Sequence, residues 1–231
     1  MEEFKNNIES FDLLMSTTTS KYSRLINYVQ YYIGNTAGIH SHIAICIWGN
    51  IFPDDTILSC KDKEYKIEKN ELYLFESVFD TKREATDIFG EYFDGVQIRK
   101  FDDVYSGYKK LIESKYITQL TLAKITQQNR EIIKSYFVDG NKKFLEFINK
   151  HIRTDYNFSI IDKLYIPFHD YTIVSKLKNI NDYLYTPNNG IICSELMALI
   201  FIELKLLKED TNVKHLMPEQ FLHLCDIHIK F

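Results

Sequence analysis

Cys193 is the residue of this chain best placed by its surroundings to act as a nucleophile. It follows the loop Asn188-Asn189-Gly190 and opens the apolar run Cys193–Leu207, which predicts a buried helix that begins at the cysteine. At a helix N-terminus, unpaired N–H groups and the positive end of the dipole favour the thiolate. The N–H of Cys193 would also suit a developing oxyanion. Free cysteine is equally a common core residue, so a structural role stays open at this point.

His42 is the candidate general base. It lies in Ile39–Trp48, a run rich in β-branched residues that predicts a central strand. In an extended strand His42, Ala44 and Cys46 share one face, and the small Ala44 leaves room for a partner beside the imidazole. His40 lies on the same face, further out, and competes with His42 for the role.

A base of this kind needs a third group that orients the imidazole and fixes its tautomer. Glu76 is the candidate, because it is an acid inside the apolar run Leu72–Val78, which predicts a second strand. A carboxylate buried there requires a partner. The alternatives are an exposed acid at a strand edge, or another acid such as Asp80 or Asp87 in the orienting role.

Two other sets of residues could carry chemistry. His215, His223, Cys225 and His228 have spacings that could suit zinc, although neither strand nor helix geometry brings the last three together without distortion. We expect no metal and no cofactor. His169-Asp170 is a second candidate base, inside the aromatic segment Tyr156–Tyr185, which is interpreted either as an acyl groove or lid or as a packed insertion.

The elements around these residues alternate between strand and helix signals. Further strands are expected at Gly95–Arg99 and Tyr116–Ile125, and a short apolar segment at Phe11–Ser16. Helices are expected at Tyr22–Tyr32 and over Gln127–Ile152, with a break at Asp139-Gly140-Asn141. Pro218 precedes a terminal segment, Glu219–Ile229, of unassigned type. Strands with segregated helices indicate the α+β class.

Composition limits the classes of function. The 231 residues fit one domain, with 45% hydrophobic and 26% charged residues and a formal net charge of -4, which gives no global attraction to nucleic acid. The N-terminus lacks a signal-peptide layout, and charged residues interrupt Ile191–Leu207, so no integral membrane segment is expected. Four cysteines without a CxxC motif are interpreted as reduced thiols in the cytoplasm. Abundant Asn, Ile, Lys and Tyr are typical of AT-rich genomes, which include many large DNA viruses.

Several of these segments, in this order, resemble one known family. The chain is similar to the circularly permuted branch of the NlpC-type, papain-like cysteine hydrolases, the YaeF/YiiX-like permuted amidases that include a poxvirus branch. The family's opening GDLIL strand is matched by Asp12-Leu13-Leu14-Met15, with Phe11 where glycine is usual. Its SHVGI strand is matched by Ser41-His42-Ile43-Ala44-Ile45, with Ala44 in place of the glycine.

Later segments continue the resemblance. The VIEA strand is matched by Leu74-Phe75-Glu76-Ser77, and the GV that follows it by Gly95-Val96. The CSEL turn is matched by Cys193-Ser194-Glu195-Leu196, and the closing P-x-D-L region by Met217-Pro218-Glu219-Gln220-Phe221. Residues 100–190 match poorly, apart from Asp155-Tyr156-Asn157-Phe158, which is similar to a YDF element.

The resemblance implies a permuted papain-like fold over residues 1–231, a small antiparallel sheet or barrel packed on the buried cysteine helix, with room for an atypical insertion around 100–190. It implies Cys193 as nucleophile, His42 as base and Glu76 as the orienting group of an amide, ester or thioester hydrolase. Peptide, isopeptide or lipid-amide substrates would suit this trio, in the host cytoplasm or a virion if the source is viral. The alternative is a catalytically silent papain-like fold that serves as a binding or virion structural module. Oligomeric state stays open.

Overall fold

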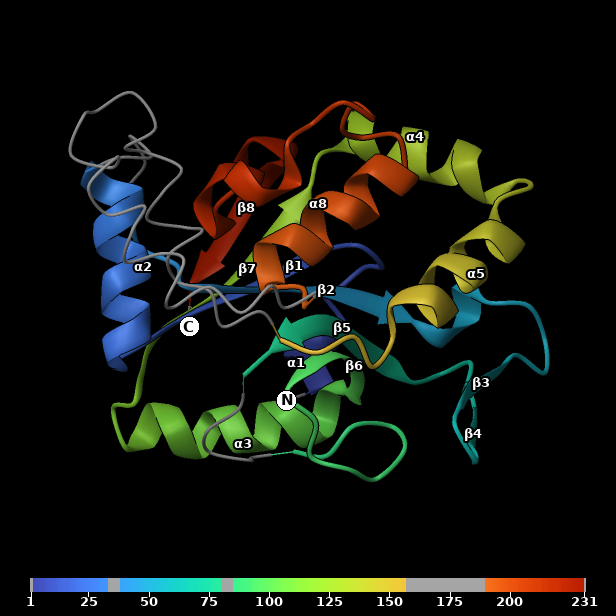
Figure 1. The fold of residues 1–231 in the computed structure, drawn as a ribbon, viewed down its shortest axis with the longest axis horizontal. Coiled ribbons are helices and arrows are strands. Elements are labelled where there is room, and N and C mark those ends of the chain that lie inside the picture. The colour runs from blue at the N-terminus through green and yellow to red at the C-terminus, as the bar shows by residue number, and fades with distance from the viewer. Residues whose placement is uncertain (1, 33–37, 80–84, 157–189, 231) are drawn as a thin grey trace, which may run out of the picture.

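The centre of the molecule is an antiparallel sheet in the order β6-β5-β2-β1-β7-β8 (Figure 1). It is seen in a computed structural model that describes residues 2–32, 38–79, 85–156 and 190–230. The strands are β1 (Leu13–Thr18), β2 (His42–Trp48), β5 (Leu72–Val78), β6 (Gly95–Lys100), β7 (Ile117–Ile125) and β8 (Cys225–Lys230). A separate hairpin joins β3 (Ile57–Cys60) to β4 (Lys63–Lys66).

Helices lie on both sides of this sheet (Figure 1). The α-helices are α1 (Glu2–Lys5), α2 (Lys21–Tyr32), α3 (Phe101–Glu113), α4 (Gln127–Phe137), α5 (Asn141–His151) and α8 (Cys193–Glu203). Short 3-10 segments are η1 (Gly49–Ile51), η2 (Val213–His215) and η3 (Pro218–Leu224). In Figure 1, α3 runs below the sheet and α8 runs above it. The expected α+β class is therefore confirmed.

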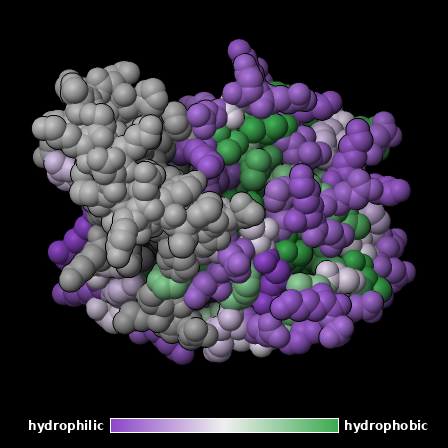
Figure 2. Space-filling view, in the orientation of Figure 1, coloured by the Kyte–Doolittle hydropathy of each residue, from purple (hydrophilic) through white to green (hydrophobic). Residues whose placement is uncertain are grey.

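The sheet is buried on both faces, and the side-chain alternation of its strands separates two cores. Ile43, Ile45 and Ile47 of β2 belong to the core that contains α8, as expected from the strand period. Ala44 and Cys46 belong to the core on the α3 side. Two buried faces explain why the central strands are nearly continuous hydrophobic runs. On the face drawn in Figure 2, hydrophilic residues surround smaller hydrophobic clusters.

The expected strand at Leu72–Val78 has the predicted limits, and the others agree within a few residues. Residues 127–151 form two helices separated at Gly140, where the sequence predicts a break. The unassigned terminal segment forms η3 and then the edge strand β8. Apart from Tyr156, the aromatic segment Tyr156–Tyr185 lies outside the described residues. The part of 100–190 that is described is built into the fold, because β7 pairs with both β1 and β8.

The helix that begins at Cys193 is apolar on nearly all sides because it is enclosed. Leu196, Met197, Ile200 and Phe201 are all fully buried, and the helix packs against β2 and β5. It ends at Glu203, four residues before the end of the apolar run. Among the described residues, no helix has the length and apolar character needed to cross a membrane.

Phe11 departs from ordinary backbone geometry. Its φ of 77° is in the left-handed region, which favours glycine, and glycine is the residue that the resembling family has here. Its side chain is buried, with ring centroids 5.3 Å from Phe137 and 5.7 Å from Phe144. Aromatic packing therefore offsets the backbone strain in this chain.

This balance predicts that glycine destabilises the protein less than alanine does at position 11, the reverse of the usual order. Phe11→Ala should lower the free energy of unfolding by about 3–5 kcal/mol through lost packing. Phe11→Gly should be about 1 kcal/mol less damaging than Phe11→Ala, because glycine removes the left-handed strain. Denaturant unfolding measures both. At Phe144, inside α5, Phe144→Gly should instead lower the free energy of unfolding by about 1 kcal/mol more than Phe144→Ala does. If Phe11→Gly were likewise more destabilising than Phe11→Ala, the backbone strain at Phe11 would be contradicted.

Candidate active site

The N-terminus of α8 is fixed to the sheet by the residues just before it. The Ser77 hydroxyl of β5 donates to the Ile191 carbonyl, and the Ile191 N–H donates to the Asp155 carbonyl at 2.9 Å. The Ile192 N–H donates to the Glu195 carboxylate at 3.0 Å, which caps the first turn. Cys193 is the first residue of the helix and is nearly buried, at 4% exposure. The nucleophile candidate is thus held at a positive helix end.

His42 connects the cysteine to the sheet. It is the first residue of β2, and its Nε2 lies 2.7 Å from a Glu76 carboxylate oxygen on neighbouring β5. A second hydrogen bond joins the imidazole to Cys193. Because Glu76 occupies Nε2, Nδ1 is the ring nitrogen left for the thiol. The structure therefore brings together all three residues that the sequence singles out.

Glu76 is fully buried, so the alternative of an exposed acid at a strand edge is wrong. One carboxylate oxygen faces His42, and the other accepts from Arg99 of β6, with Nε at 2.9 Å and Nη2 at 2.8 Å. Arg99 is itself only 1% exposed. Each oxygen of the carboxylate therefore has a cationic or potentially cationic partner, as burial of a charge requires.

These contacts set the protonation states of the site. Burial opposes the charged form of Glu76, but the nearby Arg99 charge and the His42 hydrogen bond lower its pKa to about 2. Burial likewise opposes the charged form of His42, yet the hydrogen bonds and charges of Cys193 and Glu76 raise its pKa to about 10. An interaction that favours the imidazolium favours the thiolate equally. These contacts favour the imidazolium form of His42.

The other buried thiols have the opposite environment. Burial raises the pKa of Cys46 well above its ordinary value, with nearby Asp12 and Glu76 adding to the effect. Burial also raises the pKa of Cys225 to about 12. All four cysteines are free thiols. Contact with His42 is what distinguishes Cys193 from Cys46 and Cys225.

Tyr156 approaches the site from the end of the described stretch 85–156. Its N–H donates to the Asp94 carbonyl at 3.1 Å, which fixes the backbone beside β6. Burial, and then the charges of Cys193 and Glu195, raise the pKa of its phenol above the usual range. The side chain is therefore a neutral phenol close to the cysteine. Its ring centroid lies 6.1 Å from that of Phe79.

His40, the competing base, has different partners. Its Nδ1 lies 2.8 Å from the Glu219 carboxylate and its Nε2 lies 2.9 Å from the Thr121 hydroxyl. Both ring nitrogens are thus committed to hydrogen bonds away from Cys193. The second candidate, His169-Asp170, lies outside the described residues.

The zinc alternative finds no support in the stretches that the structure describes, which hold no group of three or more His, Cys, Asp or Glu able to bind a metal ion. Cys225 is buried, whereas His223 and His228 are exposed. Alternation along β8 and the preceding 3-10 turn explains this separation.

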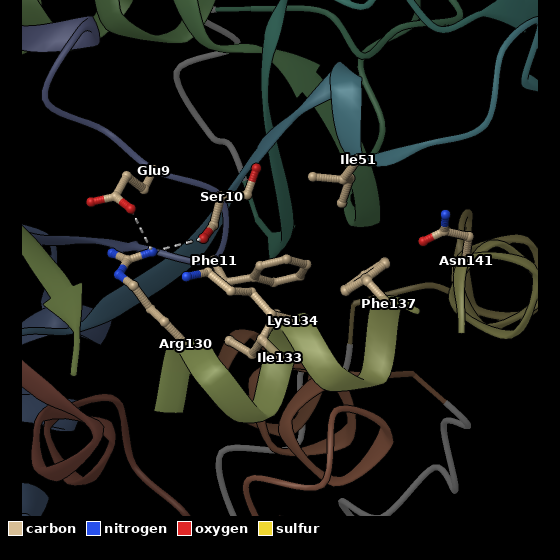
Figure 3. Close-up of a pocket in the computed structure, with 9 residues that line it drawn as sticks. All are labelled: Glu9, Ser10, Phe11, Ile51, Arg130, Ile133, Lys134, Phe137 and Asn141. Atoms are coloured by element: carbon tan, nitrogen blue, oxygen red, sulfur yellow. Dashed lines mark hydrogen bonds and ion pairs between the residues drawn. The ribbon is translucent and has the colours of Figure 1, made fainter. Parts of the chain in front are cut away.

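A cavity of about 320 Å³ lies elsewhere (Figure 3). Its lining residues are Glu9, Ser10, Phe11, Ile51, Arg130, Ile133, Lys134, Phe137 and Asn141. Ile51 lies in η1, just beyond the C-terminal end of β2, whereas His42 is the first residue of β2. The cavity is therefore at the opposite end of that strand from His42. Arg130 is paired with Asp12 and Glu9, so its charge is already engaged by carboxylates of the protein. The candidate active site is therefore at the Cys193 end.

Comparison with known proteins adds no relative: no family model, no curated protein and no solved structure matches this chain.

Arg99 is the member of the site that sequence reasoning missed. It lies in the predicted strand Gly95–Arg99, as a charged residue among apolar ones, and is two residues from Gln97, the cross-strand partner of Glu76. Two opposite charges inside apolar strands were a signal for a buried pair, but strand pairing is not visible in the sequence alone.

We predict that losing one charge of the Arg99–Glu76 pair destabilises the fold more than losing both charges. Arg99→Met should lower the free energy of unfolding by about 3–5 kcal/mol, because it leaves the Glu76 carboxylate buried without its permanent cation. Adding Glu76→Gln to that variant should restore part of the loss. Denaturant unfolding at pH 7 measures both variants.

Lys100→Met is the matched control, because Lys100 is the next residue and pairs with the exposed Glu68 at 3.1 Å. Its cost should stay within about 0.5 kcal/mol. An Arg99→Met cost as small as that of Lys100→Met would contradict the balanced charge pair.

Proposed function

We propose that this protein is a cysteine hydrolase that cleaves an amide, ester or thioester bond through a thioacyl intermediate. The single observation that carries the proposal is the continuous hydrogen-bond chain from Cys193 through His42 to Glu76, backed by Arg99. Nucleophile, base and orienting group within hydrogen-bond reach of one another are the requirements of this chemistry.

The first half-reaction follows from the protonation states of the pair. The Cys193 thiolate attacks the carbonyl carbon, forming the S–C bond, and the helix N-terminus stabilises the oxyanion. The imidazolium of His42 gives its proton to the leaving nitrogen, oxygen or sulfur as the bond to carbon breaks. The products are a thioester on Cys193 and a free amine, alcohol or thiol.

The second half-reaction restores the resting pair. Neutral His42 takes a proton from a water molecule as its oxygen attacks the thioester carbon. The C–S bond then breaks, a carboxylic acid leaves, and Cys193 returns as the thiolate beside the imidazolium. Glu76 holds the imidazole orientation in both steps, and Arg99 keeps Glu76 ionised.

The order of these residues along the chain supports a permuted papain-like relationship. Base strand, acid strand and cysteine helix follow one another, as in the permuted NlpC-type family that the sequence resembles. In that arrangement β2 and β5 are adjacent in the sheet, and α8 packs against both of them. The proposed substrate class stays as broad as peptide, isopeptide and lipid amides, because many acyl groups suit the same trio.

Covalent chemistry at Cys193 provides the test. With p-nitrophenyl butyrate, the protein should release a burst of nitrophenolate equal to the enzyme concentration, and intact-mass analysis should find one butyryl group on Cys193. A Cys60→Ser background removes the half-buried thiol, and the raised pKa values of Cys46 and Cys225 keep those two thiols protonated. His42→Ala should slow the burst by about 10²–10⁴-fold.

Cys193→Ala is the matched negative control and should give no burst and no adduct. Equal acylation of the wild type and of Cys193→Ala would overturn the hydrolase proposal. Stable folding with no acylation of either protein would favour the silent binding module instead.

A further inference from the structure

A second buried histidine–glutamate pair lies two residues before His42 in the chain. The Glu219 carboxylate of η3 accepts from the His40 N–H at 3.1 Å and contacts His40 Nδ1 at 2.8 Å. The backbone N–H of Ile39 also donates to this carboxylate. One side chain from the C-terminal part of the fold therefore binds three nitrogens of the segment that leads into β2.

Gln30 of α2 completes a closed ring with these residues. Its amide donates to the His40 carbonyl at 2.6 Å, and its carbonyl accepts from the Glu219 N–H at 3.0 Å. Both backbone polar groups of His40 are consequently engaged by buried side chains. Three elements distant in sequence meet at this one residue.

The outer nitrogen of His40 is also fixed. Its Nε2 lies 2.9 Å from the Thr121 hydroxyl of β7, and Gln119 of the same strand lies 3.3 Å away. His40, Gln30, Thr121 and Glu219 are each less than 9% exposed. A buried network in which each member is satisfied holds a single conformation, because breaking any bond leaves an unpaired group.

Ser41, between His40 and His42, is also held by hydrogen bonds. The Ser41 N–H donates to the Ser16 carbonyl at 3.0 Å, and its hydroxyl donates to Ser23 at 2.7 Å. His42 follows directly, and its ring must reach Glu76 and Cys193 together. A shift of about 1 Å in such a chain of contacts costs roughly 10²-fold in rate.

We infer that Glu219, acting through His40, is a positioning residue that sets the place of His42 against Cys193. This inference rests on the proposed function. It assigns to the closing segment of the chain a part in catalysis, although Glu219 touches no reacting group. Substitution of Glu219 therefore tests whether the His40–Glu219 pair positions His42 in the active site.

The test uses the full chain in the Cys60→Ser background and follows iodoacetamide alkylation of Cys193 from pH 3 to 9. In Glu219→Gln, which keeps the shape but removes the charge, we expect the pKa that governs alkylation to rise by about one unit. At pH values below that pKa the alkylation rate should then fall about tenfold, since one pKa unit is tenfold in thiolate there. Butyrate ester turnover should show kcat lowered by about ten- to a hundredfold with KM within about threefold.

Thr121→Val supplies a milder variant that removes the nearer hydrogen-bond partner of His40 Nε2 and should give a loss of about threefold in the same direction. Glu209→Gln, on an exposed loop, is the matched charge control. Ile148→Val in the core controls for stability, because it costs about 0.5–1.5 kcal/mol without touching the network. Neither control should change the alkylation profile.

Two outcomes would overturn the inference, and they differ. If Glu219→Gln and Thr121→Val lower the melting temperature but keep the wild-type alkylation profile and kcat, the network is structural and the proposed function stands. If the wild type itself shows no selective alkylation of Cys193 at low pH, the proposed function fails and the positioning role fails with it.

Discussion

The ionised carboxylate of Glu76, enclosed by protein, is the constraint on which the site depends. A buried anion is tolerated when permanent or induced positive charge meets it, and here Arg99 and His42 both do so. Charging His42 in turn calls for a second anion, which Cys193 supplies. Two cations and two anions then sum to zero net charge. A thiolate at Cys193 satisfies this charge balance, and the helix N-terminus favours it.

The antiparallel sheet is what allows these four groups to meet. His42, Glu76 and Arg99 lie on β2, β5 and β6, which are consecutive in the sheet, so neighbouring strands bring their side chains within hydrogen-bond distance. Cys193 approaches from another layer, on a helix enclosed by the apolar core. Ser77 of β5 fixes the loop before that helix, so one strand positions both the acid and the nucleophile.

Much of this arrangement could be predicted from the sequence, for identifiable reasons. Strand period and β-branched runs located β2 and β5, and the Gly190 turn before an apolar run located the start of α8. What could not be predicted depends on pairing between distant segments: Arg99 beside Glu76, and Glu219 beside His40. Local pattern also gave no hint that Phe11 adopts a left-handed conformation, because aromatic packing formed elsewhere in the fold offsets its strain. The terminal β8 was missed because an edge strand with mostly exposed residues lacks the apolar run that marks a central one.

The charge state of His42 distinguishes a thiolate–imidazolium pair from a neutral one. Histidine-selective ¹⁵N labelling with an NMR titration from pH 5 to 11 reports the protonation of each ring nitrogen. We expect His42 to be an imidazolium at pH 7 and to release its proton with a pKa of about 10, because Cys193 and Glu76 outweigh the opposing effect of burial. In Cys193→Ala that pKa should fall toward neutrality. A neutral His42 at pH 7, with the same titration in both proteins, would contradict the thiolate–imidazolium pair.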